Sequence, residues 1–189
     1  LMVGTQRQFV ERLGGYTVLT TSINTISTGE LFVKRLFDII GGLVGCVLTG
    51  ILFLFLAPAI KIQSPGPVFF SQIRVGKNGK KFKLYKFRSM YTDAEERKAQ
   101  LAAENRVTDG LMFKLDFDPR IIGCRQLPDG TVKKGIGNFI RDWSFDEFPQ
   151  FWNVLKGDMS LVGTRPPTED EWVRYELHHR SRLAIKPGI

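Results

Sequence analysis

An acid pair, Asp146 and Glu147, lies in the stretch of the sequence richest in residues that could do chemistry, RDWSFDEFPQFWNVLKGDMSLVGTRPP. Ser144 and Glu147 have the spacing of a capping box, which predicts that both acids lie in the first turn of a helix. An ionised carboxylate there can act as a nucleophile or bind a hard divalent cation. Acids also occur in first turns simply because they complement the helix dipole, so the pair alone does not establish a catalytic site.

Arg141 places a cation just upstream of the acid pair. A helix N-terminus offers free amide groups and a positive field, which suit phosphate and keep a carboxylate ionised. We therefore expect Arg141, the acids and the helix end to converge on one diphosphate. Adjacent side chains on a helix diverge by about 100°. This divergence predicts a division of labour, with one acid as the nucleophile and the other as a metal ligand.

A basic hairpin is predicted to supply further phosphate contacts. Pro67 to Ile73 and Phe82 to Phe87 have the composition of strands, and Asn78-Gly79 between them is typical of a hairpin turn. Seven cations and no acid occur from Arg74 to Arg88. Such a hairpin beside a membrane can bind lipid headgroups or a phosphorylated substrate, and the alternative is a charged hairpin that contacts only water.

A run of 22 residues without a charge extends from Ile39 to Ile60. As a helix it would be about 33 Å long, enough to cross the hydrocarbon core of a bilayer. We interpret it as a membrane segment, the alternative being a helix buried in the core. Cations flank both ends, and Thr49-Gly50 and Pro58 could bend the helix. We therefore expect a re-entrant helix with both ends on the cytoplasmic face, with a tilted single crossing as the alternative.

The length of 189 residues predicts one domain of ordinary size, and the net charge of +8 implies a polyanionic partner. Cys46 lies in the apolar run and Cys124 in a polar stretch, so we expect no disulfide between them and a reducing compartment. No Walker-type loop, GxGxxG or GxSxG is present, which disfavours nucleotide hydrolysis, dinucleotide redox chemistry and serine acyl transfer.

Several local elements are also predicted. A zinc site at His178 and His179 is not expected, because no further ligand has the usual spacing. Near the start of the chain we expect a helix over Phe9 to Leu13 and a strand over Tyr16 to Thr20.

Three further helices are expected. One extends from Asp93 to about Asn105 and is capped by Thr92 and Glu95, an amphipathic one is capped by Thr168 and Glu171, and one ends at Gly157 with a core face of Phe148, Phe151, Trp152 and Leu155. Irregular structure with short strands is expected over Arg106 to Gly137.

Five ordered motifs resemble the bacterial sugar transferases, the monotopic polyprenyl-phosphate phosphoglycosyl transferases. They are KRLFDI from Lys34, SPGPVFFSQIRVG from Ser64, KLYKFRSM from Lys83, FKLDFDPRI from Phe113 and SFDEFPQFWNVLKGDMSLVGTRPP from Ser144. The resemblance implies transfer of a sugar 1-phosphate from a UDP-sugar to undecaprenyl phosphate, with release of UMP, at the cytoplasmic face of the bacterial inner membrane.

The resemblance also implies a role for individual residues. Asp146 would attack the β-phosphate and form a covalent phosphosugar enzyme, and Glu147, with Asp146, would bind Mg²⁺. The substrate-binding positions by the same resemblance are Arg141, Lys86, Arg88, Arg165, Arg35 and Asp38. Of these, Arg35 and Asp38 would lie where the polyprenyl phosphate head sits.

Two positions depart from the family pattern. Gly50-Ile51 stands where many members have a Ser-Pro that breaks the re-entrant helix, and Thr164 replaces the first Pro of a GPRP motif. The chain begins and ends without clear termini, so we expect it to be a piece of a longer protein. Residues 1–29 would be the end of a regulatory domain and a linker, 30–63 the re-entrant helix, and 64–189 the catalytic domain, incomplete at its C-terminus.

These expectations combine into a mixed α/β, membrane-associated catalytic domain with one re-entrant helix. Glucose 1-phosphate from UDP-glucose is the expected donor group, with UDP-galactose as the nearest alternative, for capsule or exopolysaccharide assembly. The expected partners are the UDP-sugar, undecaprenyl phosphate and membrane lipid, without nucleic acid, and a homo-oligomer is left open. The alternative from another class is a noncatalytic basic module that binds membrane or nucleic acid. That module would account for the charge of +8 but not for Asp146 and Glu147 beside Arg141.

Overall fold

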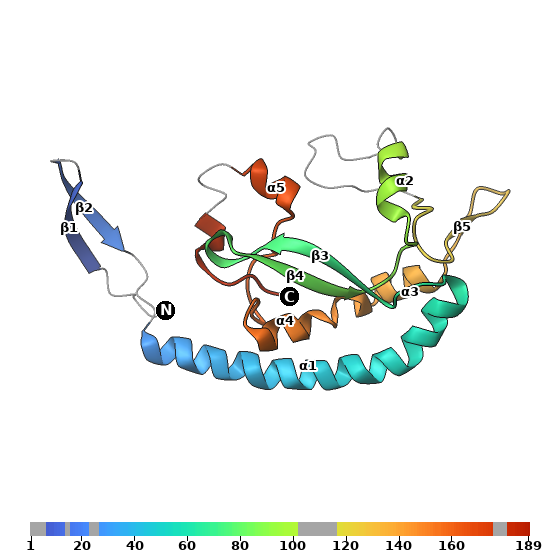
Figure 1. Cartoon of the computed structure of the whole chain (residues 1–189), viewed down its shortest axis with the longest axis horizontal. Helices are drawn as coiled ribbons and strands as arrows, with labels where there is room; N and C mark the ends of the chain where they lie inside the picture. Colours follow the sequence, from blue (N-terminus) through green and yellow to red (C-terminus); the bar gives the residue numbers. More distant parts are fainter. Residues whose placement is uncertain (1–6, 14–15, 23–26, 102–116, 176–180) are drawn as a thin grey trace. The chain divides into compact units, whose positions relative to one another are not determined.

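The computed structural model describes residues 7–13, 16–22, 27–101, 117–175 and 181–189 (Figure 1). The chain divides into two compact units, Leu1–Phe37 and Asp38–Ile189, which are described separately. Several expectations fall wholly or partly outside the described residues. They include parts of the segment 1–29, the end of the helix predicted to reach Asn105, the start of the irregular segment predicted from Arg106, the first four residues of the motif from Phe113, and the pair His178 and His179.

The first unit contains an antiparallel hairpin of β1 (Arg7–Leu13) and β2 (Tyr16–Ser22), followed by the start of a long helix. The strand predicted from Tyr16 is confirmed. The helix predicted over Phe9 to Leu13 is wrong, because this segment pairs along its whole length with a strand rich in Thr. Cross-strand pairing therefore overrides a weak local helix pattern.

The long helix α1 (Thr28–Gln63) begins with a capping box that the sequence analysis missed. The Glu30 amide donates to Ser27 Oγ at 3.2 Å, and the Ser27 amide donates to Glu30 Oε2 at 2.9 Å. The helix has 36 residues, which at 1.5 Å per residue gives a length of about 54 Å. The uncharged run is thus the larger part of one helix that starts eleven residues earlier.

Thr49-Gly50 does not interrupt α1. The Thr49 hydroxyl donates to the Gly45 carbonyl at 2.7 Å and to the Phe148 carbonyl at 3.0 Å, so its polarity is satisfied without a break in the helix. Figure 1 shows instead that the C-terminal turns of α1, which contain Pro58, curve away from the line of the preceding turns. Proline lacks an N–H and clashes with the preceding turn, which accounts for curvature at that end.

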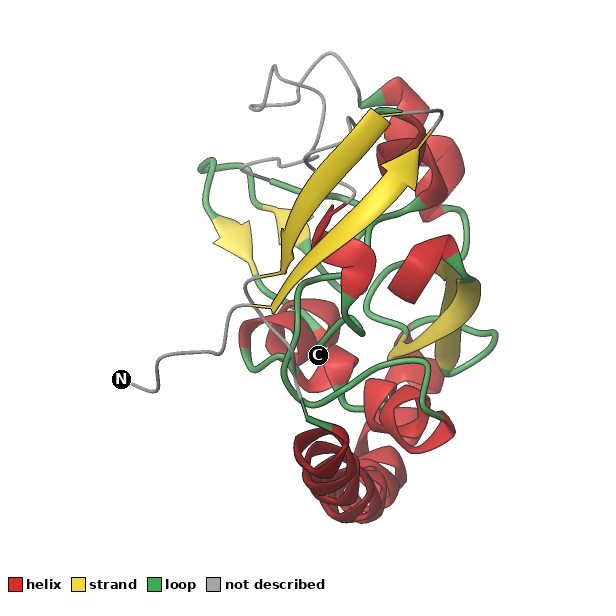
Figure 2. Ribbon diagram, turned by 90° about the vertical axis from the view of Figure 1, so that its left-hand side faces the viewer, coloured by secondary structure: helices red, strands yellow, loops and turns green. Residues whose placement is uncertain are grey.

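Most of the apolar surface of α1 is exposed. Only 17% of its most apolar window is buried, and Leu54 and Phe55 are each 70% exposed. Figure 2, viewed nearly along this helix, shows the β3–β4 hairpin and the short helices of the second unit on one side of it. The alternative of a helix buried on all sides is therefore wrong, and α1 is a candidate membrane span by length, composition and exposure.

The predicted basic hairpin is confirmed as β3 (Phe69–Val75) and β4 (Lys81–Phe87), paired antiparallel with Phe69 opposite Phe87 and Val75 opposite Lys81. The turn between them contains the short 3-10 helix η1 (Lys77–Gly79). Asn78 and Gly79 have φ values of 56° and 78°, which are the left-handed values that Asn and Gly adopt most readily.

Short elements make up the rest of the second unit. They are α2 (Ala94–Gln100), β5 (Arg125–Gln126), β6 (Val132–Lys133), α3 (Ile136–Asp142), the 3-10 helix η3 (Phe145–Glu147), α4 (Gln150–Lys156), α5 (Glu169–Val173) and the 3-10 helix η4 (Ser181–Ala184). The mixed helix and strand class is confirmed, and so is irregular structure with short strands for the described part of 106–137.

Two of the three predicted capping boxes, at α5 and α2, have different outcomes. At α5 the box is formed, since the Glu171 amide donates to Thr168 Oγ1 at 3.1 Å and the Thr168 amide donates to Glu171 Oε2 at 2.9 Å. At α2 the predicted box of Thr92 and Glu95 is wrong, because Asp93 occupies the N-cap position. The Asp93 carboxylate instead accepts a hydrogen bond from Arg97 Nε at 2.8 Å.

Helix α1 approaches α4 closely through glycines. A Cβ added at Gly45 would lie 2.1 Å from the Phe151 ring, and one at Gly42 would lie 2.8 Å from the Leu155 side chain. Any larger residue at Gly45 would therefore separate α1 from α4. Two apolar clusters complete the packing, one of Leu56, Ala57, Ile60, Val68, Phe87, Ile122 and Ile140 and one of Phe82, Leu84, Val154 and Met159. The second cluster joins β4 to α4 and so fixes the hairpin against the segment that carries the acids.

Candidate active site

The acid pair lies in η3, a short 3-10 turn that precedes α4. Ser144 has φ 55° and ψ 22°, and its side chain makes no capping hydrogen bond. The predicted capping box of Ser144 and Glu147 is therefore wrong, because a capping residue normally has an extended backbone and Ser144 is left-handed. Pro149 occupies the N-cap position of α4, so the acids come just before this helix rather than in its first turn.

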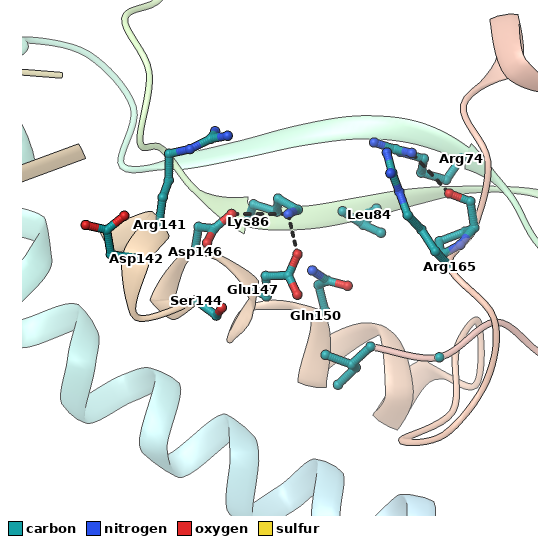
Figure 3. A pocket seen from close by; sticks show the side chains of 13 residues that line it. Arg74, Leu84, Lys86, Arg141, Asp142, Ser144, Asp146, Glu147, Gln150 and Arg165 are labelled. Atoms are coloured by element: carbon teal, nitrogen blue, oxygen red, sulfur yellow. Dashed lines mark hydrogen bonds and ion pairs between the residues drawn. The ribbon is translucent and has the colours of Figure 1, made fainter. Parts of the chain in front are cut away.

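Lys86 of β4 joins the two acids. Its Nζ lies 3.1 Å from Asp146 Oδ2 and 2.8 Å from Glu147 Oε1, as Figure 3 shows. The side chain of Asp146 is 12% exposed and that of Glu147 is 41% exposed. Both carboxylates reach the same ammonium although adjacent side chains diverge, and the predicted division of labour between them stays a prediction. Both can therefore also reach one ligand in the same cavity.

A cavity of about 680 Å³ opens at this cluster. Four cations and three acids are among its lining residues, which include Arg74, Lys86, Arg141, Arg165, Asp142, Asp146 and Glu147. Figure 3 shows the Asp142 carboxylate turned away from Lys86, and Asp142 instead pairs with Lys134 at 2.8 Å. The cations therefore face the cavity in excess, as a site for a polyanion requires. The predicted convergence of Arg141 with the acid pair is consistent with this lining.

Arg74 and Gln150 line the cavity but were not among the predicted site residues. The strand register could have predicted that Arg74 lies near Lys86. Gln72 lies opposite Leu84, and Phe70 lies opposite Lys86, so the even-numbered residues of β3 share a face with Lys86. Counting alternate residues from Lys86 across the predicted hairpin thus leads to Arg74. Gln150 has no comparable signal, because its position depends on how η3 joins α4.

Arg74 is buried and held in place by neighbouring oxygens. Its Nη1 donates to the Pro166 carbonyl at 3.0 Å, and its Nη2 donates to Gln72 Oε1 at 2.8 Å. Burial and the nearby charge of Arg165 lower the pKa of Arg74, and Glu171 and Glu147 partly offset this. An arginine still keeps its charge at neutral pH under such a shift. The positive charges of Arg74 and Arg165 repel each other, and a bound anion would reduce this repulsion. The two arginines therefore favour binding of an anion in the cavity.

Three predicted substrate-binding residues are not among those that line this cavity. Arg88 is buried, and its guanidinium donates to the Ser64 and Pro65 carbonyls at the end of α1, where burial lowers its pKa. Asp38 is buried as well, and its Oδ1 accepts from Ser160 Oγ at 2.9 Å and from the Leu161 amide at 3.0 Å. Arg35 belongs to the first unit. The binding roles of these three residues stay predictions. The contacts of Asp38 and Arg88 have a structural effect as well, because they attach α1 to the Ser160 loop and the segment after α1 to the end of β4.

A divalent cation is compatible with the residues of η3. Among the described residues, no cluster of three or more His, Cys, Asp or Glu side chains forms a protein-only metal site. Magnesium, however, is usually bound by one or two carboxylates together with substrate phosphates and water. Asp146 and Glu147 provide two carboxylates at the edge of a cationic cavity. Lys86 contacts one oxygen of each, which leaves the other oxygen of each acid as a candidate ligand.

The family assignment follows from comparison of the whole second unit with known sequences. The family described as bacterial sugar transferase matches residues 29–189. The chain belongs to this family. The match includes the hairpin, η3 and the loop that carries Arg165, so the elements that build the cavity are those of the bacterial sugar transferases. The resemblance drawn from the five motifs is thereby confirmed.

Several curated relatives are similar over most of the chain. Galactosyl transferase CpsE of Streptococcus agalactiae serotype III (strain NEM316) is 49% identical over 180 residues, which cover 95% of this chain and 37% of the relative. Undecaprenyl-phosphate galactose phosphotransferase of Salmonella typhimurium is 37% identical over 169 residues, 88% of this chain and 33% of the relative. Undecaprenyl-phosphate glucose phosphotransferase of Komagataeibacter xylinus is 34% identical over 186 residues, 95% of this chain and 31% of the relative. The chain spans about a third of the length of these relatives.

Proposed function

We propose that this chain transfers a sugar 1-phosphate from a UDP-sugar to undecaprenyl phosphate and releases UMP, as the first membrane step of capsule or exopolysaccharide synthesis. The observation that carries the proposal is the mostly buried Asp146 carboxylate at the edge of a cavity with four cations, in a chain of the sugar transferase family. A basic module that only binds membrane would need the cations but not the carboxylates among them.

In the first half-reaction, a carboxylate oxygen of Asp146 attacks the β-phosphorus of the UDP-sugar. The bond between this phosphorus and the bridging oxygen breaks, and UMP leaves with that oxygen and its electron pair. The product is an aspartyl phosphosugar. An ionised carboxylate needs no general base for this attack. Arg141 and Arg165 line the same cavity and are suited to neutralise the diphosphate.

In the second half-reaction, a phosphate oxygen of undecaprenyl phosphate attacks the same phosphorus. The acyl–phosphate bond to Asp146 breaks, the carboxylate is regenerated, and the lipid diphosphate sugar leaves. Lys86 contacts Asp146 Oδ2 at 3.1 Å, so it can stabilise the carboxylate as it reforms. One carboxylate thus serves two successive substrates.

Magnesium is the proposed cofactor, held by Glu147 and Asp146. When bound, it neutralises diphosphate charge and stabilises the departing UMP. Glu147 is the more exposed of the two acids, which favours it as the main ligand and leaves Asp146 as the nucleophile.

The sugar is proposed to be a hexose, with glucose and galactose as the two candidates. Glucose is the sugar expected from the sequence. The 49% identical relative is named a galactosyl transferase, whereas the relative named for glucose is 34% identical. Galactose is therefore the donor sugar to test first.

We propose that the second unit lies on the cytoplasmic face of the inner membrane, with α1 re-entrant. The exposed apolar surface of α1 and the curvature at its Pro58 end support this geometry. Single cysteines at the exposed residues 30 and 61, in a protein without its native Cys46 and Cys124, are probed with an impermeant thiol reagent in intact cells and in inverted vesicles to test it. Labelling of both positions only in inverted vesicles supports the re-entrant helix, and opposite labelling would mean a full crossing.

The experiment that tests the proposed function measures UMP release from a panel of UDP-sugars with undecaprenyl phosphate and Mg²⁺. The chain should be assayed within its full-length protein. Release that depends on both one UDP-sugar and the lipid phosphate is the expected result. No release from any UDP-sugar in an intact, folded preparation would favour the noncatalytic module.

A further inference from the structure

A second cavity, of about 320 Å³, meets the first at the catalytic cluster. Its lining shares four residues with the first cavity, Arg74, Lys86, Arg141 and Asp146. Asp146 therefore lies where the two cavities join. A group bound in either cavity can present a phosphate to the same carboxylate.

The two cavities differ in chemistry. Beyond the shared residues, the first is lined mainly by polar and charged side chains. The wall of the second has an aromatic and apolar part, formed by Phe69, Phe70, Phe87, Met90 and Tyr91. Its other lining residues include Arg88 and Glu95, so the second cavity combines charged groups with an apolar wall.

The apolar wall begins directly beside Lys86. Phe70 lies opposite Lys86 in the β3–β4 register, and cross-strand partners share one face of a hairpin. Phe70 is 41% exposed, so its ring is available to a ligand. A ligand whose phosphate contacts Lys86 would place its next atoms against this ring.

The apolar wall also continues to α1. Phe69 stacks on Phe87 with ring centroids 5.1 Å apart, and on its other side it stacks on Phe53 of α1 at 5.5 Å. Phe69 further lines a third cavity of about 370 Å³ with Cys46 and Thr49 of α1. Phe69, which also lines the second cavity, therefore connects its wall with apolar residues of α1, from the face of the hairpin opposite to Phe70.

We propose that the second cavity binds the acceptor lipid, with its phosphate at Lys86, Arg141 and Asp146 and its first prenyl units against the Phe70 ring on the same face of the hairpin. This inference rests on the proposed function. A nucleotide sugar has a diphosphate and polar rings, which suit the first cavity. A prenyl phosphate has one charged end and a hydrocarbon chain that must stay in contact with the membrane. The second cavity and the Phe69–Phe53 stack offer that combination.

Kinetic separation of the two substrates tests the proposal on the full-length protein in detergent micelles. Phe70→Ala should raise the KM for undecaprenyl phosphate about tenfold, equivalent to about 1.4 kcal/mol, while the KM for the UDP-sugar changes less than about twofold. Phe70→Leu, which keeps an apolar side chain, should restore most of the loss. Leu127→Ala is the matched control, since Leu127 is also 41% exposed but does not line this cavity.

Three outcomes would overturn the proposal. An increase in the KM for the UDP-sugar alone would assign the aromatic wall to the uracil ring. Unchanged KM values for both substrates would exclude the cavity from binding either. Equal losses in Phe70→Ala and Leu127→Ala would indicate a general effect on the fold.

A binding measurement separates this proposal from the proposed function. Asp146→Asn protein is exposed to a photoreactive prenyl phosphate, and the crosslinked peptides are mapped by mass spectrometry. Crosslinks to the peptide of residues 69–91, competed by undecaprenyl phosphate, are expected even if the enzyme has no turnover. Crosslinks that avoid this peptide would overturn the lipid site, whatever the activity.

Discussion

Replacement of Lys86 by methionine should slow the reaction while leaving the fold intact. The change removes two charge-assisted contacts, at 3.1 Å to Asp146 and 2.8 Å to Glu147, and keeps a side chain of similar length. A hydrogen bond to a charged group contributes about 1.5 to 3 kcal/mol, and the pair with the 41% exposed Glu147 counts for less because water screens it. A net loss of about 2 to 3 kcal/mol corresponds to a fall of about 30- to 150-fold in kcat/KM.

The assay is UMP release with saturating undecaprenyl phosphate and varied UDP-sugar. Lys83→Met is the matched control, because Lys83 is exposed on the opposite face of the same strand. It removes the same charge without touching the acids and should retain nearly full activity. Equal kcat/KM values in the two variants would refute the reasoning that Lys86 acts through its contacts with the acid pair. Thermal melting of both variants checks that the fold is retained.

Three further predictions follow from other contacts. Glu147→Gln should raise the Mg²⁺ concentration for half-maximal activity severalfold, and an unchanged titration would locate the metal elsewhere. Gly45→Ala should destabilise the protein by about 1 to 3 kcal/mol, because the added Cβ would meet the Phe151 ring. Gly50→Ala is the control, since the space around Gly50 is open, and it should leave the stability nearly unchanged. Equal melting temperatures for the two variants would contradict this prediction. Burial raises the pKa of the Asp118 carboxyl, but the hydrogen bonds and charge of Arg120 outweigh this and hold it below its usual value. Asp118→Asn should therefore lower the melting temperature above about pH 5, and the difference from wild type should shrink as the pH falls below about 4 toward the lowered pKa. A difference in melting temperature that grows as the pH falls would contradict that sign.

Elements specified by local sequence were predicted well. The β3–β4 hairpin follows from Asn78-Gly79, whose left-handed backbone few other residue pairs adopt as easily. The long helix follows from an uncharged run whose length alone exceeds that of most buried helices. Thr168 and Glu171 form their capping box because both partners lie within one turn. In each case the interactions that decide the structure join residues close in sequence.

Features that depend on tertiary contacts were predicted less well. The left-handed Ser144 separates η3 from α3, and nothing in the spacing of Ser144 and Glu147 indicates it. The contact of Lys86 with the acid pair joins residues sixty positions apart and depends on the packing of β4 against α4. Asp38 was expected beside the lipid phosphate, yet its carboxylate contacts the Ser160 loop more than a hundred residues away. Motif spacing indicated the candidate reactive residues but not the contacts that these residues make.

The central claim is that Asp146 forms a covalent phosphosugar, and intact-mass analysis tests it most directly. The full-length protein is incubated with the UDP-sugar and Mg²⁺ in the absence of lipid acceptor, beside its Asp146→Asn variant. The account predicts a mass increase of one hexose phosphate in the wild type, mapped to the peptide with Asp146 and removed by undecaprenyl phosphate, and no increase in the variant. An adduct of the same mass in the Asp146→Asn protein, or near-normal turnover by it, would contradict the account.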